Sequence, residues 1–114
     1  MTALQYTIQL NQGETSSIIF PVVDEFGTSV SVAGWTGKSQ IRACDGSPAV
    51  LYEWSSAHAN ITVSGVSVTL RVPAADSAGW TWTDALYDLI LTDLSGNVYR
   101  IAEGPVIVDP AITI

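Results

Sequence analysis

The chain has little charge, and most of the charge it has is acidic. Charged residues make up 13% of its 114 residues, and 11 acids outnumber 4 cations to give a net charge of −7. An average protein carries about 25% charged residues. With so few cations, the chain has little to offer nucleic acid phosphates or an anionic membrane surface. We therefore expect neither nucleic acid nor membrane as a partner.

Low charge also raises the question of what covers the surface. Either a partner protein covers part of it, or the abundant Ser and Thr residues supply the polar coat. Composition alone does not separate these two interpretations.

Cysteine and histidine are each represented once, by Cys44 and His58. A single thiol excludes an internal disulfide. His58 lies in an expected loop beside Ser55 and Ser56, and a Ser–His or Cys–His pair would need a contact that spacing does not reveal. No Gly-x-Ser-x-Gly motif is present, although hydrolases of that type need one. We predict a non-enzymatic protein without catalytic residues.

Metal and cofactor motifs are also missing. The acidic residues fall mostly at expected turns and strand ends, where a carboxylate accepts hydrogen bonds from nearby backbone amides. None of these turns matches a calcium-binding loop of the EF-hand type. We therefore expect no metal and no cofactor.

No long apolar segment is present either. The amino terminus lacks a basic stretch followed by an apolar one, so no secretory signal is visible. No apolar run approaches the roughly 20 residues that cross a bilayer. We expect synthesis in a reducing cytoplasm.

What the chain does contain is a series of short apolar runs separated by turn residues. The clearest is a hairpin in which two extended runs, starting at Tyr87 and Val98, flank Ser95-Gly96-Asn97. These turn residues tolerate the positive φ angles of tight hairpins. A third run, Val106 to Val108, lies between Pro105 and Pro110, neither of which has a backbone N–H to donate to a neighbouring strand.

The rest of the chain follows the same pattern. Pro21 interrupts the second run and predicts an edge, a bulge or a change of sheet. Residues 73–79 have the only helical character, and Trp80 and Trp82 are expected to resume extended structure. The expected strands are Leu4 to Leu10, Thr15 to Val23, Trp35 to Ala43, Ala49 to Trp54, Ile61 to Val63 and Val66 to Val72. The sequence thus predicts one all-β domain over residues 1–114. It is expected to be a two-layer antiparallel β-sandwich of the immunoglobulin-like kind with at most one short helical turn, a closed barrel being the alternative.

Four tryptophans are many for so small a domain. We assign Trp35 to the core. Trp80 and Trp82 share one face, so both are buried or both are presented, and with Trp54 they are candidates to contact a protein partner or stack on a sugar. The segment Ala111 to Ile114 is apolar and uncharged, which makes Ile112 and Ile114 candidates to pair within the sheet or add to a neighbouring chain.

Several stretches along the chain resemble the small immunoglobulin-like β-sandwich proteins of tailed-phage virions, found among baseplate, tail-fibre-associated and head-associated components. The matching stretches are Gln12 to Thr15, Asp24 with Gly27, Val32 to Trp35, Gln40 to Arg42, Tyr87 to Asp93 with Gly96 to Val98, Arg100, Glu103 to Val106, Val108, Pro110 and Ile112 to Thr113.

The resemblance implies a non-enzymatic virion protein, made in the host cytoplasm, that docks or bridges at a tail tip, baseplate or fibre attachment site. Its implied partners are other virion proteins and copies of itself in a homo-oligomer. A capsid decoration protein is one alternative. A carbohydrate-binding module that holds a surface glycan on exposed tryptophans is another.

Overall fold

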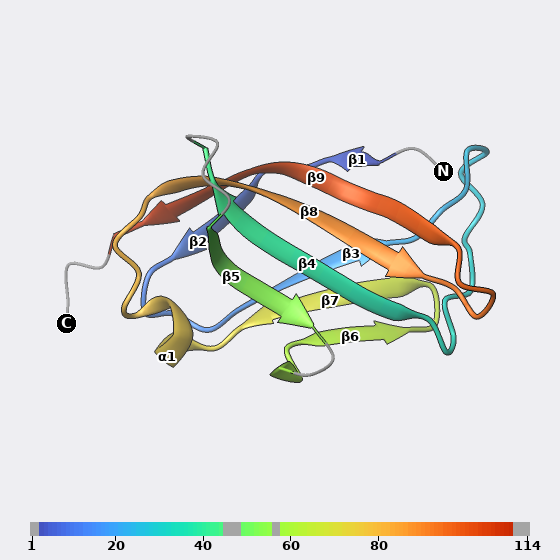
Figure 1. Cartoon of the computed structure of the whole chain (residues 1–114), viewed down its shortest axis with the longest axis horizontal. Helices are drawn as coiled ribbons and strands as arrows, with labels where there is room; N and C mark the ends of the chain where they lie inside the picture. The colour runs from blue at the N-terminus through green and yellow to red at the C-terminus, as the bar shows by residue number, and fades with distance from the viewer. Residues whose placement is uncertain (1–2, 45–48, 56–57, 111–114) are drawn as a thin grey trace.

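The computed structural model describes residues 3–44, 49–55 and 58–110, which form two β-sheets packed face to face (Figure 1). The six-stranded sheet has the order β1–β9–β8–β4–β5, with β2 also on β9; the three-stranded sheet has the order β3–β7–β6. Their bounds are β1 Leu4–Gln5, β2 Ile8–Asn11, β4 Thr36–Ala43, β5 Val50–Ser55, β8 Asp84–Thr92 and β9 Val98–Asp109, and β3 Ser16–Pro21, β6 Ile61–Ser64 and β7 Ser67–Val72. The predicted all-β sandwich is confirmed, and the strand order is consistent with an immunoglobulin-like fold.

Most neighbouring strands are antiparallel, as expected, but β1 and β2 run parallel to β9. Parallel neighbours need a long connection, and here almost the whole domain lies between the first strands and the last. The single helix of the described residues, α1 Ala74–Ser77, lies within the expected helical segment.

The predicted hairpin from Tyr87 onward is the centre of the six-stranded sheet. Its turn is organised by Asp93, whose Oδ1 accepts hydrogen bonds of 2.9 Å from the backbone amides of Ser95 and Asn97. Gly96 takes a φ of +87°. Burial acts to raise the pKa of Asp93, but its hydrogen bonds with Asn97, Ser95 and Tyr99 outweigh burial and hold it below its ordinary value. The charge of Asp93 therefore stabilises the turn.

One prediction for this region is wrong. Val106 to Val108 is not a separate strand, because β9 continues from Val98 through Pro105 to Asp109. The proline is tolerated because the neighbouring edge is interrupted there: β1 ends at Gln5 and β2 begins at Ile8, which leaves no partner that needs an amide donor from Pro105 on that side.

The core lies between the sheets and follows the period-two pattern. Val68, Leu70 and Val72 point inward from β7, and Ile8 and Leu10 do so from β2. The alternation does not extend to the first residues of the expected strands Leu4 to Leu10 and Val66 to Val72, because Leu4, Tyr6 and Val66 are 46–47% exposed. Leu4 lies in the short strand β1, Tyr6 lies in the interruption between β1 and β2, and Val66 falls in the β6–β7 turn.

Pro21 is the last residue of β3, which is an edge strand of the three-stranded sheet. This confirms one of the three interpretations of that proline. The expectation for Trp80 and Trp82 is not met, because residues 80–83 form no strand and β8 begins only at Asp84.

Candidate functional site

An aromatic cluster lies beside α1 at one end of the sandwich. The rings of Trp80 and Trp82 stack with centroids 4.7 Å apart, and Tyr52 meets Trp80 edge-on at 5.1 Å. Gln12 fixes the loop that carries them, because its Nε2 donates to the carbonyl oxygens of Ala78 at 3.0 Å and Trp80 at 2.8 Å. The two tryptophans thus share one environment, as predicted, but they are neither buried nor fully presented: both are partly buried against the core.

Trp54 is a correction to the sequence analysis. Its side chain is fully buried, and its indole N–H donates to the carbonyl oxygen of Arg71 at 3.0 Å. It alternates inward on β5 and fills the space between the sheets, so it offers no surface to a partner or a sugar. Trp35, assigned to the core, is only partly buried at its margin, where it stacks on Tyr99 at 5.7 Å.

A small cavity of about 330 Å³ opens next to this cluster. Tyr52 donates its hydroxyl hydrogen to Asp76 at 2.5 Å and accepts a 3.1 Å hydrogen bond from Asn60. Burial, reinforced by the bond to Asp76, raises the pKa of Tyr52 to about 12. The phenol is therefore a neutral structural donor at physiological pH.

His58 lies at the rim of the same cavity and does contact a serine. Its Nδ1 is 3.0 Å from Ser55 Oγ, and the same nitrogen is 3.7 Å from Glu53 Oε2. A Ser–His–acid relay needs the serine and the acid on opposite ring nitrogens. In this arrangement both approach one nitrogen, so it is not such a relay. Cys44 is exposed.

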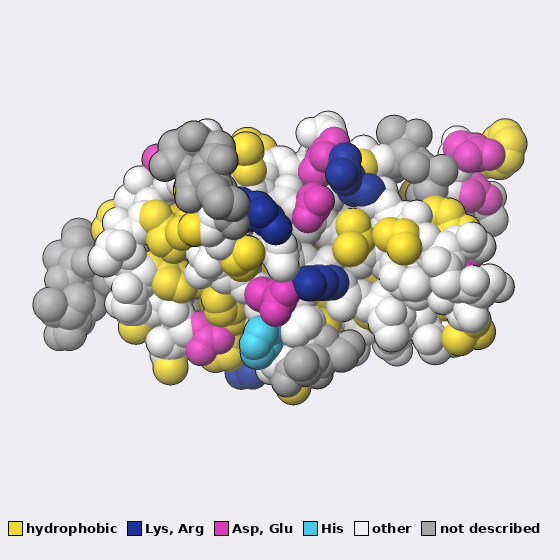
Figure 2. Space-filling model, viewed as in Figure 1, with side chains coloured by type: hydrophobic (Ala, Val, Ile, Leu, Met, Phe, Trp, Pro, Cys, Tyr) yellow, Lys and Arg dark blue, Asp and Glu magenta, His cyan; other side chains and the backbone are white. Residues whose placement is uncertain are grey.

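The outer face of the six-stranded sheet holds three of the four cations of the chain (Figure 2). Lys38 lies 3.3 Å from Glu53, and Arg100 lies 3.7 Å from Asp88 and 3.4 Å from Glu103. Hydrogen bonds from Gln40 and from Lys38 lower the pKa of Glu53. A shallow hollow of about 760 Å³ runs across this face past Arg42 and Leu86. The charges there are largely balanced within the face itself.

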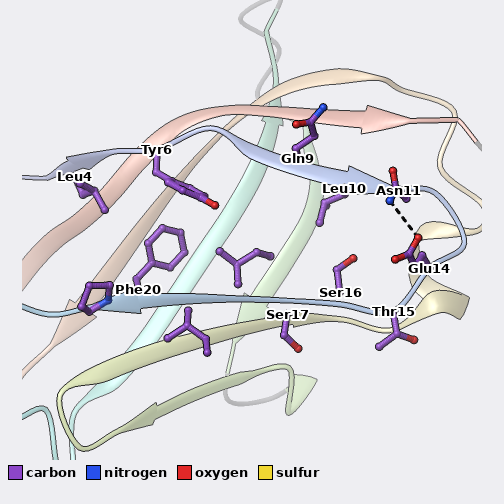
Figure 3. Close-up of a pocket in the computed structure, with 13 residues that line it drawn as sticks. Leu4, Tyr6, Gln9, Leu10, Asn11, Glu14, Thr15, Ser16, Ser17 and Phe20 are labelled. Atoms are coloured by element: carbon purple, nitrogen blue, oxygen red, sulfur yellow. Dashed lines mark hydrogen bonds between the residues drawn. The ribbon is translucent and has the colours of Figure 1, made fainter.

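A groove of about 520 Å³ lies between two sheet edges (Figure 3). One wall is β1 and β2, and the other is β3. Tyr6, Leu10 and Phe20 point into the gap, and the Tyr6 and Phe20 rings meet edge-on at 5.5 Å. Glu14 is the one charged residue among those lining it, and it accepts a 3.1 Å hydrogen bond from Asn11.

The free edge of β3 carries unused hydrogen-bonding groups. Val22 N–H donates to Val66 at 2.9 Å, in the register that pairs Phe20 with Val68 and Ile18 with Leu70. Hydrogen-bonded pairs alternate along an antiparallel ladder. The backbone N–H and C=O groups of Ser17 and Ile19 therefore face away from β7, toward the open side, and Ile19 is 66% exposed.

Of the predicted interface residues, the structure places Trp80 and Trp82 together and Trp54 in the core. Ile112 and Ile114 lie outside the described residues. The sequence analysis did not predict the groove, because the order of strands within each sheet decides that β1 and β2 lie opposite β3. Pro21 was the available signal, since it marked β3 as a possible edge.

Comparison with known proteins adds no assignment: no family model matches the chain, and no curated protein matches it. Among the described residues, no three or more His, Cys, Asp or Glu side chains are placed to hold a metal ion. None of the helical segments in the described part of the chain has the length and hydropathy needed to cross a membrane.

Proposed function

We propose that this chain is a non-enzymatic structural protein of a tailed-phage virion. In this role it docks or bridges at the tail tip, the baseplate or a fibre attachment site, as the resemblance in sequence implies. Its partners are other virion proteins and copies of itself.

The observation that carries the docking role is the open edge of β3. Natural monomers blunt such edges with lysine, proline, bulges or a covering segment. The strand Ser16–Pro21 has no charged residue, and only Pro21 at its end blocks pairing. An uncharged edge beside an open groove supports a protein that works by joining other chains.

Capsid decoration is the nearest alternative. An acidic sandwich with few charges suits a head position as well as a tail position. The two differ in copy number, because a decoration protein covers a whole head.

Quantitative mass spectrometry of purified particles separates these positions. A few to a few dozen copies per particle support a tail role, and hundreds support head decoration. Absence of the chain from purified particles would remove both virion roles.

A carbohydrate-binding module is the alternative from a different class, and the Trp80–Trp82 pair is what favours it. Stacking engages one face of each ring and Tyr52 meets Trp80 edge-on, so Trp82 is the better platform for a sugar. Titration with cell-wall or surface polysaccharide, followed by tryptophan fluorescence, tests this function. Trp82→Ala should abolish any change, and an unchanged wild-type spectrum at saturating glycan would count against the module.

A further inference from the structure

We propose that the groove between β1/β2 and β3 receives the segment Ala111 to Ile114 of a second copy of this chain, added as a strand to the free edge of β3. This inference rests on the proposed docking role of the same edge. It names the partner as the chain itself and the contact as backbone pairing.

The pattern of the segment fits the groove. An added strand would pair with the free backbone groups of Ser17 and Ile19 and would end before Pro21, which has no N–H to offer. Ile112 and Ile114 are two residues apart, so both side chains fall on one face of an extended strand. Directed into the groove, that face would meet Tyr6, which is 46% exposed.

The charge of the segment also fits. The segment Ala111–Ile114 has no charge, and the groove wall has one charged residue, Glu14. In a chain with a net charge of −7, contact through uncharged surfaces brings two copies together with the least repulsion.

The geometry favours a segment from another copy over the chain's own. β9 ends at Asp109, whose carbonyl accepts a 2.9 Å hydrogen bond from Gln12 at the β2–β3 turn. To reach its own β3, the segment would have to pass β2, cross the roughly 10 Å between sheets and reverse direction. Four residues cannot do this and also lie along Ser16 to Ile19.

The exit point makes exchange between two copies possible. The chain leaves β9 beside Asn11 and Glu14, which line one end of its own groove. Two copies can therefore exchange segments across a twofold axis, each filling the groove of the other, in a closed interface that buries both free edges.

The test compares charged variants on and off the free edge. Ile19→Lys puts a charge at the edge, whereas Thr69→Lys puts the same charge at its register partner on β7. Likewise Ile112→Asp charges the inward face of the segment, and Thr113→Asp charges the other face. Sedimentation velocity measures self-association, and circular dichroism establishes that each variant is folded.

We expect the wild type to form dimers, and Ile19→Lys and Ile112→Asp to weaken association at least tenfold. Thr69→Lys and Thr113→Asp should change it much less. A wild type that stays monomeric at millimolar concentration overturns the proposal, as does a dimer that Ile19→Lys and Ile112→Asp leave intact.

Cross-linking tests the contact directly in a Cys44→Ala background. One tagged copy carries Ile19→Cys and a differently tagged copy carries Thr113→Cys, which in the proposed strand faces outward as Ile19 does, and a short bis-maleimide joins them. We expect a cross-linked heterodimer, which should be lost when Ser95→Cys at the β8–β9 turn replaces Ile19→Cys. Equal cross-linking at both positions, or cross-linking only within one copy, contradicts the proposal.

These results are separable from the virion role. A purified chain that remains monomeric but is found in particles removes the self-pairing and leaves the docking role. A chain that pairs through the segment but is absent from particles retains the pairing and loses the virion role.

Discussion

Gly104→Ala is the smallest change from which we expect a large loss of stability. Gly104 has a φ of +155°, and a Cβ added there would lie 2.4 Å from the carbonyl oxygen of Tyr6 and 3.0 Å from its carbonyl carbon. That peptide cannot move freely. The Tyr87 hydroxyl donates to the same oxygen at 2.7 Å, and Tyr6 N–H donates to Glu103 at 3.1 Å. A methyl group must therefore displace the chain between β1 and β2.

The magnitude follows from three contributions. Overpacking costs about 1–3 kcal/mol, a side chain in a sparsely populated backbone region costs about 1 kcal/mol, and a lost hydrogen bond from Tyr87 costs about 1 kcal/mol. The total is about 3–5 kcal/mol, a large share of the roughly 5–15 kcal/mol that stabilises a domain. At about 4 °C per kcal/mol, the Tm should fall by about 12 °C or more.

The assay is urea unfolding followed by tryptophan fluorescence, with thermal melts by circular dichroism. Gly79→Ala is the matched control, because nothing lies within 4 Å of its added Cβ. It should stay within about 0.5 kcal/mol of the wild type. If Gly104→Ala also stayed within that limit, the close approach of Tyr6 to β9 would be refuted.

Three further outcomes are expected. Tyr87→Phe should lower the free energy of unfolding by about 1–2 kcal/mol, since the Tyr6 carbonyl loses its donor, and it should be non-additive with Gly104→Ala in a double-mutant cycle. The pKa of Tyr52 is raised from 10.0 to about 12. The contribution of Tyr52 to the free energy of unfolding is therefore present below pH 10 and is lost as the pH rises toward 12. The urea midpoint of the wild type should fall across that window more than that of Tyr52→Phe. The pKa of Asp93 is lowered from 3.8, so the wild type should be more stable than Asp93→Asn at neutral pH, and this advantage should vanish as the pH falls through the native pKa. An advantage that persists in strong acid would show that the charge is not what stabilises the turn.

Local patterns predicted most of the strands because turn chemistry and period-two alternation act over a few residues. Ser95-Gly96-Asn97 and Ser64-Gly65 each lie at the turn of an observed hairpin. Arg100 and Glu103, three positions apart on β9, likewise form a local contact, with their side chains 3.4 Å apart. In these cases the residues that decide the structure are close in sequence.

The errors arose where a distant segment decides the outcome. Pro105 was expected to end a strand, but the gap between β1 and β2, about a hundred positions earlier in the chain, removes the need for its donor. Trp54 was grouped with the exposed tryptophans because its own strand does not reveal which face meets the other sheet. Burial of Trp54 depends on the carbonyl of Arg71, which comes from β7 across the core.

Most of the few cations of the chain lie on one face of the fold. Lys38, Arg42 and Arg100 lie on the outer face of the six-stranded sheet among Glu53, Asp88 and Glu103. The free edge of β3 has none of the lysines that would keep another strand away, although an isolated sandwich needs protection most at its edges. Ser16 and Ser17 supply polar atoms there. This strand therefore fits both interpretations of the low charge, namely a polar coat of Ser and Thr and a surface that a partner covers. Serine hydroxyls keep an edge strand hydrated but do not prevent another strand from pairing with it, whereas a charged side chain keeps the edge hydrated and also disfavours pairing. An edge that is hydrated but carries no charge is therefore suited to pair with a strand from another chain.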